Sequence, residues 1–306
     1  MYLTPYQKKQ IRYVLILLLG IPATLFAVYK GIQLATQATS DPTPKDVVVS
    51  NITTNSITVS WVTEKSVEAF VIPVVSGSEQ SPVPDKRGGG KRITHYVELR
   101  NITPDNEYTL ILLSDGERDE KGSVGSFKAR TAPITTDTPS PDPAHGTVTG
   151  GNAEDILIYV LFSNRVAYPV STIVPENGNW LLDLSTLRII ENMNLAKTTD
   201  DTEIVLLARE GVTRGAVLEG TYSSLFDSNG KLNSAYTLTI GDLTEYVSYF
   251  PSEAILGSAA ASTITPTPTP SVPEEEEERS EEHTSELQFK SVNIVCRLLL
   301  EKKKII

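Results

Sequence analysis

The stretch from Thr94 to Asp115, THYVELRNITPDNEYTLILLSD, places the strongest constraint on how this chain can fold. Residues 95–100 put His, Val and Leu on one face and Tyr, Glu and Arg on the other, and this period of two predicts a half-buried strand. Residues 101–106 supply Asn, Pro and Asp, which favour a tight turn. Tyr108 opens a second strand, and such a tyrosine can bury its ring and return its hydroxyl to the backbone upstream.

Composition limits the classes of protein that remain. A length of 306 residues suggests two domains, and a hydrophobic content of 40% is enough for two cores. The net charge of −11 disfavours nucleic acid as a partner, because a polyanion repels phosphate backbones. Cys296 is the one cysteine of the sequence, so the chain cannot form an intrachain disulfide framework.

The N-terminal residues have the pattern of a membrane anchor. Residues 1–12 carry three basic side chains and no acid, and we expect them to stay in the cytoplasm. Residues 13–35 are long and apolar enough for a transmembrane helix, with Lys30 reaching the outer interface. The alternative is a signal peptide cleaved near Ala38, which would release a secreted protein. In both cases the rest of the chain lies outside the cytoplasm.

Residues 42–133 show short strand patterns with turn residues between them, which predicts an all-β sandwich. The segments SITVSW (56–61), the corner at 101–108 and GSFKART (125–131) resemble a fibronectin type III domain. Trp61 stands where that family has its core tryptophan, and Ile102, Pro104 and Tyr108 match its Leu-x-Pro-x-x-x-Tyr corner. The resemblance implies a seven-stranded sandwich that serves as a spacer or binding module.

A second β-sandwich is expected over residues 144–241, after a Pro/Thr/Asp linker at 134–143. Residues 155–162, DILIYVLF, form a near-continuous apolar strand pattern, and the Asn-Gly pair at 177–178 indicates a hairpin turn. Residues 171–188, which include Trp180, resemble the hairpin of carboxypeptidase regulatory-like domains. That resemblance implies a non-catalytic, transthyretin-like sandwich, and an Ig-like sandwich remains the alternative.

The C-terminal residues have the composition of a stalk and a tail. Residues 242–278 are expected to form a Pro/Thr/Glu-rich stalk, with a Thr-Pro segment at 263–273 and an acidic run at 274–278. Residues 279–288, RSEEHTSELQ, look like the translation of a common sequencing-library adapter. We therefore expect residues 279–306 to be non-native, and Cys296 receives no functional weight.

Candidate residues for chemistry are few. His95 and His145 fall in different domains, and no hydrolase, zinc or phosphate-loop motif occurs in the sequence. The acids at 200–203 and at 227–229 do not have the spacing of a helix-loop-helix calcium loop. We expect no catalytic residue, no cofactor and no metal, and hence a protein that is not an enzyme.

These patterns together predict a bacterial cell-surface protein at the plasma membrane, with one transmembrane helix and two extracellular sandwiches for structure, adhesion or protein interaction. Its partner would be a protein or a cell-wall glycan. One alternative is that the sandwiches are accessory modules of an exported hydrolase whose catalytic domain is missing from this chain. Another is a glycan-binding module, although Trp61 and Trp180 both have the pattern of core residues.

Overall fold

The computed structural model describes residues 21–22, 24, 26, 28–30, 41–119 and 127–257, all of which belong to one structural unit of the chain. The expected cytoplasmic tail, most of the expected transmembrane helix and residues 258–306 lie outside this set. Among the residues described, no helix is long and apolar enough to cross a membrane.

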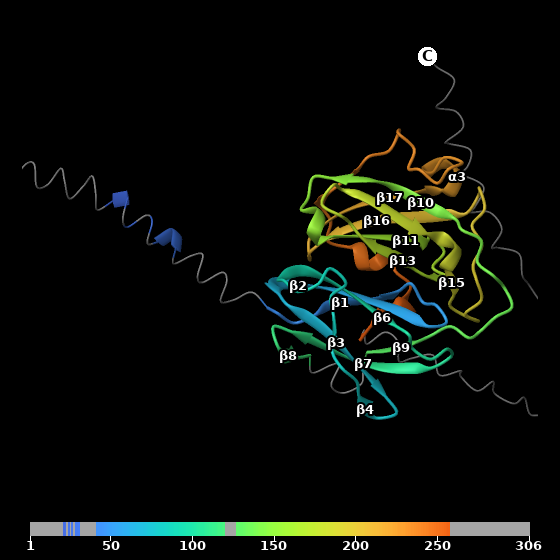
Figure 1. Ribbon diagram of the computed structural model, residues 1–306. Helices are drawn as coiled ribbons and strands as arrows, with labels where there is room; N and C mark the ends of the chain where they lie inside the picture. Colours follow the sequence, from blue (N-terminus) through green and yellow to red (C-terminus); the bar gives the residue numbers. More distant parts are fainter. Residues whose placement is uncertain are drawn as a thin grey trace, which may run out of the picture. The chain divides into compact units, whose positions relative to one another are not determined.

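The first sandwich consists of two antiparallel sheets (Figure 1). One sheet has the order β20-β1-β2-β6, and the other is centred on the pair β3 and β7. The strands are β1 (Lys45–Ser50), β2 (Ser56–Val67), β3 (Ala69–Val75), β4 (Ser78–Glu79), β5 (Val83–Pro84), β6 (Arg92–Arg100), β7 (Glu107–Ser114), β8 (Glu117–Arg118), β9 (Lys128–Arg130) and β20 (Ile255–Leu256).

Strand alternation builds the core of this first sandwich. Ile57, Val59 and Trp61 of β2 point between the two sheets, where they meet the inward side chains of the other strands. The alternating residues of β6 and β7 do the same, which follows from the period of two in the sequence. The all-β prediction is confirmed for this part of the chain.

The second sandwich has a five-stranded sheet, β13-β11-β16-β17-β19, and a three-stranded sheet, β14-β10-β18. Strand β18 runs parallel to β10, while the other pairs are antiparallel. The elements are β10 (Pro143–Thr149), η1 (Ala153–Asp155), β11 (Ile156–Phe162), β12 (Ala167–Tyr168), β13 (Val170–Ile173), β14 (Asn179–Asp183), η2 (Leu184–Thr186), β15 (Arg188–Ile189), β16 (Glu203–Glu210), β17 (Arg214–Thr221), α3 (Tyr222–Leu225), β18 (Leu238–Thr239) and β19 (Gly241–Asp242).

The turn at 175–178 differs from the expected hairpin. The turn itself forms, with the Gly178 N–H bonded to the Pro175 carbonyl and Gly178 at a φ of 75°. Its flanking strands, however, belong to different sheets, because β13 pairs with β11 and β14 pairs with β10. The turn is therefore a corner that carries the chain from one sheet to the other, and the predicted hairpin is wrong.

Residues 243–257 also differ from the sequence expectation, which placed the start of a stalk at residue 242. They form two short 3-10 helices, η3 (Tyr246–Tyr249) and η4 (Ser252–Ala254), followed by β20. Tyr246, Phe250 and Ala254 are buried and recur every four residues, so this segment has an apolar face. Burial of that face holds these residues against the sandwiches, and the expected stalk does not begin before residue 258.

The two sandwiches are stacked face to face. Alternate residues of β11 point in opposite directions: one set enters the core of the second sandwich, and the other meets the first sandwich. All seven residues of β11 are buried as a result. A strand that is covered on both faces must be apolar throughout, which explains the near-continuous apolar run at 155–162.

Candidate functional site: the joint between the sandwiches

The residues marked by the sequence as structural signatures lie in two separate cores. Trp61 and Trp180 are buried, one in each sandwich. Tyr108 is buried as well, and its hydroxyl accepts a hydrogen bond from the Thr103 backbone N–H at 2.7 Å. Ile102 packs against the same core and Pro104 lies half-buried in the corner. These residues hold the fold and do not converge on a site.

The acids considered for calcium are not brought together, and Asp227 has a local role. Within residues 41–119 and 127–257, no three His, Cys, Asp or Glu side chains are grouped as metal ligands would be. One Asp227 oxygen accepts hydrogen bonds from the backbone N–H groups of Asn229 and Lys231, at 2.8 and 3.0 Å. This contact closes a turn of the second sandwich.

His95 lies in the interior of the first sandwich with 1% of its surface exposed. Its Nε2 atom is 2.9 Å from the Thr63 hydroxyl, and its ring lies 5.1 Å from the Trp61 ring. Burial lowers the pKa of His95 from 6.5 to about 3, because the apolar surroundings disfavour the charged imidazolium. The environment of His95 is that of a neutral core residue.

A third apolar core lies between the sandwiches, and we call this contact surface the joint. It joins the face of the β1-β2-β6 sheet to the face of the β13-β11-β16 strands. Its buried members are Val48, Tyr96, Leu157, Tyr159, Leu161, Val205, Leu207, Tyr246 and Phe250. The joint therefore resembles the interior of a domain more than the polar contact usual between modules of one chain.

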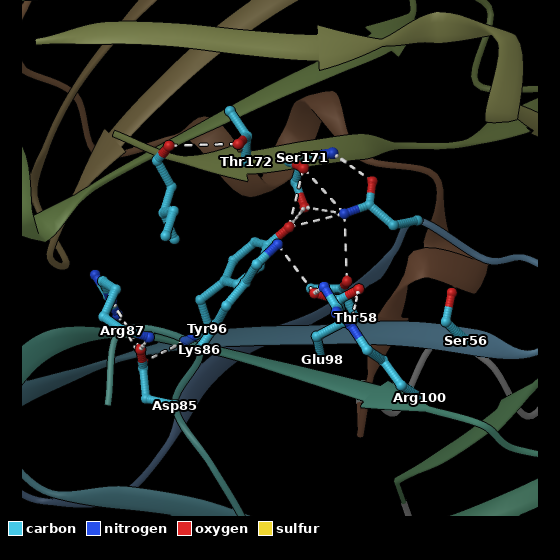
Figure 2. Close-up of polar contacts among 12 residues, drawn as sticks. Ser56, Thr58, Asp85, Lys86, Arg87, Tyr96, Glu98, Arg100, Ser171 and Thr172 are labelled. Atoms are coloured by element: carbon cyan, nitrogen blue, oxygen red, sulfur yellow. Dashed lines mark hydrogen bonds and ion pairs between the residues drawn. The ribbon is translucent and has the colours of Figure 1, made fainter. Parts of the chain in front are cut away.

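Polar side chains fix one end of the joint (Figure 2). The Asn51 amide donates to the Tyr96 hydroxyl at 2.8 Å and to the Ser171 carbonyl at 2.9 Å. In return, the Ser171 backbone N–H donates to Asn51 Oδ1 at 2.8 Å. The hydroxyls of Ser50 and Ser171 lie 2.6 Å apart. Burial raises the pKa of Tyr96 to about 12, so its hydroxyl stays protonated and able to donate.

The middle of the joint holds a buried hydroxyl pair. The Tyr159 hydroxyl lies 2.8 Å from the Ser60 hydroxyl, which belongs to the opposite sandwich. The Tyr159 ring also meets the Phe250 ring edge to face, with the ring centroids 5.1 Å apart. The relative position of the two sheets at the joint is thus fixed by a hydrogen bond as well as by apolar packing.

A buried arginine fixes another part of the joint. Arg209 of β16 is fully buried, and its Nη2 atom lies 3.1 Å from Asp46 Oδ2 of β1. Both side chains also share hydrogen bonds with the Tyr246 hydroxyl. Burial lowers the pKa of Arg209, while the neighbouring Tyr246, Tyr159 and Asp46 favour its charged form. One charge therefore links the first sandwich, the second sandwich and the C-terminal segment.

A second ion pair protects the edge of β6 beside the joint (Figure 2). The Asp85 carboxylate lies 2.7 Å from the Arg87 guanidinium and accepts the Tyr96 backbone N–H at 2.8 Å. Arg87 also donates to the Glu154 carbonyl of the second sandwich. Burial raises the pKa of Asp85, but Arg87 more than offsets this, so the pKa lies below its usual value.

Sequence reasoning missed the joint, although two signals pointed to it. The outward face of β2 carries the small uncharged residues Thr58 and Ser60, and both are buried. A strand face in contact with solvent usually carries charged side chains. Small uncharged residues on the outward face of β2 therefore indicate that another part of the protein covers this face. The second signal is Arg209 within the apolar run of β16, since a charge in such a run needs a specific partner.

Among the comparisons with known proteins, only the one with solved structures gives matches. No family model and no curated protein sequence matches this chain. Among solved structures, the central fibronectin-III array of RIM-binding protein matches at 17% identity and a TM-score of 0.22, over 55% of this chain and 57% of that one. The FN1–FN3 domains of chicken CNTN1 match at 12% identity and a TM-score of 0.25, over 58% of this chain and 65% of that one. A two-domain fibronectin type III segment of chicken tenascin matches at 14% identity and a TM-score of 0.21. That match covers 58% of this chain and 97% of the tenascin segment.

This chain spans less than two thirds of the first two of these structures. With TM-scores this low, the matches do not decide the arrangement of the two sandwiches. The architecture described above rests on strand pairing and on the three apolar cores.

Proposed function

We propose that this chain is a membrane-anchored surface protein whose two sandwiches act as one rigid, non-catalytic module for structure, adhesion or protein interaction. The observation that carries the proposal is the joint. It combines a continuous apolar core with buried hydrogen bonds and ion pairs, from Asn51 at one end to Arg209 at the other. Two modules held in this way present their loops in a fixed relative orientation.

Such rigidity suits a protein that holds a partner at a set position. Modules that move freely usually share contacts that are smaller and more polar. Here the ion pair between the buried Arg209 and the partly exposed Asp46 and the buried Ser60–Tyr159 hydroxyl pair would both have to be broken for the sandwiches to separate. In this proposal the first sandwich is a fibronectin type III domain and the second is transthyretin-like or Ig-like. The partner is a protein or a cell-wall glycan.

The charge and hydropathy of the N-terminal residues support the proposed location. Basic side chains before a long apolar run favour a cytoplasmic N-terminus and an extracytoplasmic module. The sequence has one cysteine, Cys296, so thiol labelling can report this topology once that residue is replaced by serine. Ile134 is a suitable outer position because 79% of its surface is exposed.

The test uses two matched variants in the Cys296→Ser background, Ile134→Cys and Gln7→Cys. We expect a membrane-impermeant maleimide to label I134C on cells with an intact plasma membrane. It should label Q7C only after the membrane is permeabilised. Labelling of I134C that requires permeabilisation would contradict the proposed location. Recovery of I134C in the medium would instead support the secreted form.

A further inference from the structure

Residues 243–257 form a strap that touches both sandwiches. Phe250 packs on Tyr159 of the second sandwich, and Tyr246 bonds to Arg209 of that sandwich and to Asp46 of the first. The strap then ends as β20, which adds to the edge of β1. Gly257 follows at a φ of 73°, in direct contact with the Phe127 ring, where a side chain has no room.

The chain enters and leaves this unit at the same end of β1. Strands β1 and β20 are antiparallel, with Val47 opposite Leu256 and Val48 opposite Ile255. Continuing the strand register places residue 257 next to Asp46, close to where β1 begins at Lys45. Tension applied through the two flanking segments therefore pulls β1 and β20 apart at one end. It loads their hydrogen bonds one after another rather than together, because these bonds run perpendicular to the strands.

The two strands resist that tension unequally. Strand β20 is held by two residue pairs with β1. Strand β1 also pairs with β2 over the range from Lys45 to Ser50, and Val47 and Val49 are buried in the first core. The strap should therefore yield before β1 does. The contacts that remain after β20 has separated are Ala254, Phe250 and then Tyr246, each of which is buried.

We infer that the strap is a tension-sensitive clasp, which peels from residue 257 back to residue 243 while both sandwiches stay folded. In the cell, the tension would act between the N-terminal membrane anchor and a partner bound beyond residue 257, and this part of the inference rests on the proposed function. Peeling uncovers the edge of β1 and the part of the joint around Tyr159 and Arg209. Return of the strap covers them again, so the exposed surface depends on load.

Single-molecule force measurements on the full chain test this inference directly. Handles are attached at Ser40→Cys and Ser258→Cys in the Cys296→Ser background, in detergent. We expect the first rupture to lengthen the chain by about 50 Å, which is the extended length of the strap. This rupture should be reversible and should precede the unfolding of either sandwich, which adds about 300 Å each time.

Two controls assign the rupture. Handles at Ser40→Cys and Ile134→Cys load the first sandwich without the strap, so the short step should be absent. Tyr246→Phe removes the hydroxyl that bonds Asp46 and Arg209 and should lower the force of the short step. Ser248→Ala should leave that force unchanged, because the Ser248 hydroxyl bonds within the strap, to the Glu245 carbonyl.

A first rupture that unfolds a whole sandwich would overturn the inference, as would a short step that persists with the Ser40 and Ile134 handles. Neither outcome affects the labelling test of location, which uses intact cells and no load. The clasp and the proposed function can therefore fail separately.

Discussion

The guanidinium of Arg209 lies over the ring of Tyr246, with 3.8 Å between Cζ and the ring centroid. These residues belong to β16 and to the strap, and both approach Asp46 of β1. A fully buried arginine is costly unless its charge is paired and its donors are used. This arrangement meets both needs with groups from three distant parts of the sequence, so it can form only when all three are in place.

Replacement of Arg209 should destabilise the whole unit. Arg209→Met keeps most of the side-chain volume but leaves Asp46 and the Tyr246 hydroxyl without their shared partner. We expect the free energy of unfolding to fall by about 3 kcal/mol, because the buried Arg209 side chain bonds both Asp46 and Tyr246 and both bonds are lost. Urea denaturation followed by tryptophan fluorescence measures this change.

Arg118→Ala is the matched control for Arg209→Met. Arg118 pairs with Glu79 at 2.7 Å, but both side chains are close to half exposed. Exposed ion pairs contribute little, so this variant should leave the free energy of unfolding close to that of the parent. Equal effects of the two substitutions would show that Arg209 does not hold the joint.

Asn51 gives a second prediction about the joint. Its amide bonds Tyr96 within the first sandwich and Ser171 across the joint, and it adopts a left-handed φ of 49°. Asn51→Ala should therefore cost about 3 kcal/mol, from the lost hydrogen bonds and from backbone strain. Asn101→Ala separates the cost of backbone strain from the cost of lost hydrogen bonds. Asn101 has a similar φ of 58°, but its side chain is exposed and lies outside the joint. This substitution should cost about 1 kcal/mol in the same urea experiment.

The strands of the first sandwich could be predicted from the sequence, because its residues alternate with a clear period of two. The corner from Asn101 to Tyr108 also forms, with the Tyr108 hydroxyl bonded to the backbone upstream. These features depend on residues close together in the sequence. Local periodicity and turn chemistry are therefore sufficient to indicate them.

The joint could not be predicted in the same way. It pairs Asn51 with Ser171 and Asp46 with Arg209, and no local pattern gives the partner of a buried polar residue. The run at 155–162 showed that β11 is buried but not what covers it. The strap was missed because it lies just before the Thr-Pro segment and the acidic run, although eight of its fifteen residues are apolar.

His95 predicts a pH dependence of stability. Its pKa is about 3 in the folded chain and 6.5 when exposed, so the unfolded chain binds a proton that the folded chain excludes. Stability should therefore be retained above pH 6.5 and lost as the pH falls toward 3. Between pH 7.5 and pH 5 this residue accounts for a loss of about 2 kcal/mol.

His95→Gln, which cannot take up that proton, isolates this contribution. The variant should be less stable at pH 7.5, because it disturbs the contacts with Thr63 and Trp61. It should, however, lose about 2 kcal/mol less than the parent between pH 7.5 and pH 5. Parallel stability curves for the two proteins over this range would show that His95 is not the group responsible.

A cut in the linker tests whether the joint holds the sandwiches together without a covalent connection. Residues 136–140 are exposed, so a specific protease site can be inserted between Asp137 and Thr138. The joint remains intact after cleavage, because its apolar core and its ion pairs do not involve this linker. We expect the two fragments to elute together in gel filtration under native conditions and to separate in denaturant. Separation under native conditions would mean that the linker, and not the joint, keeps the two sandwiches side by side.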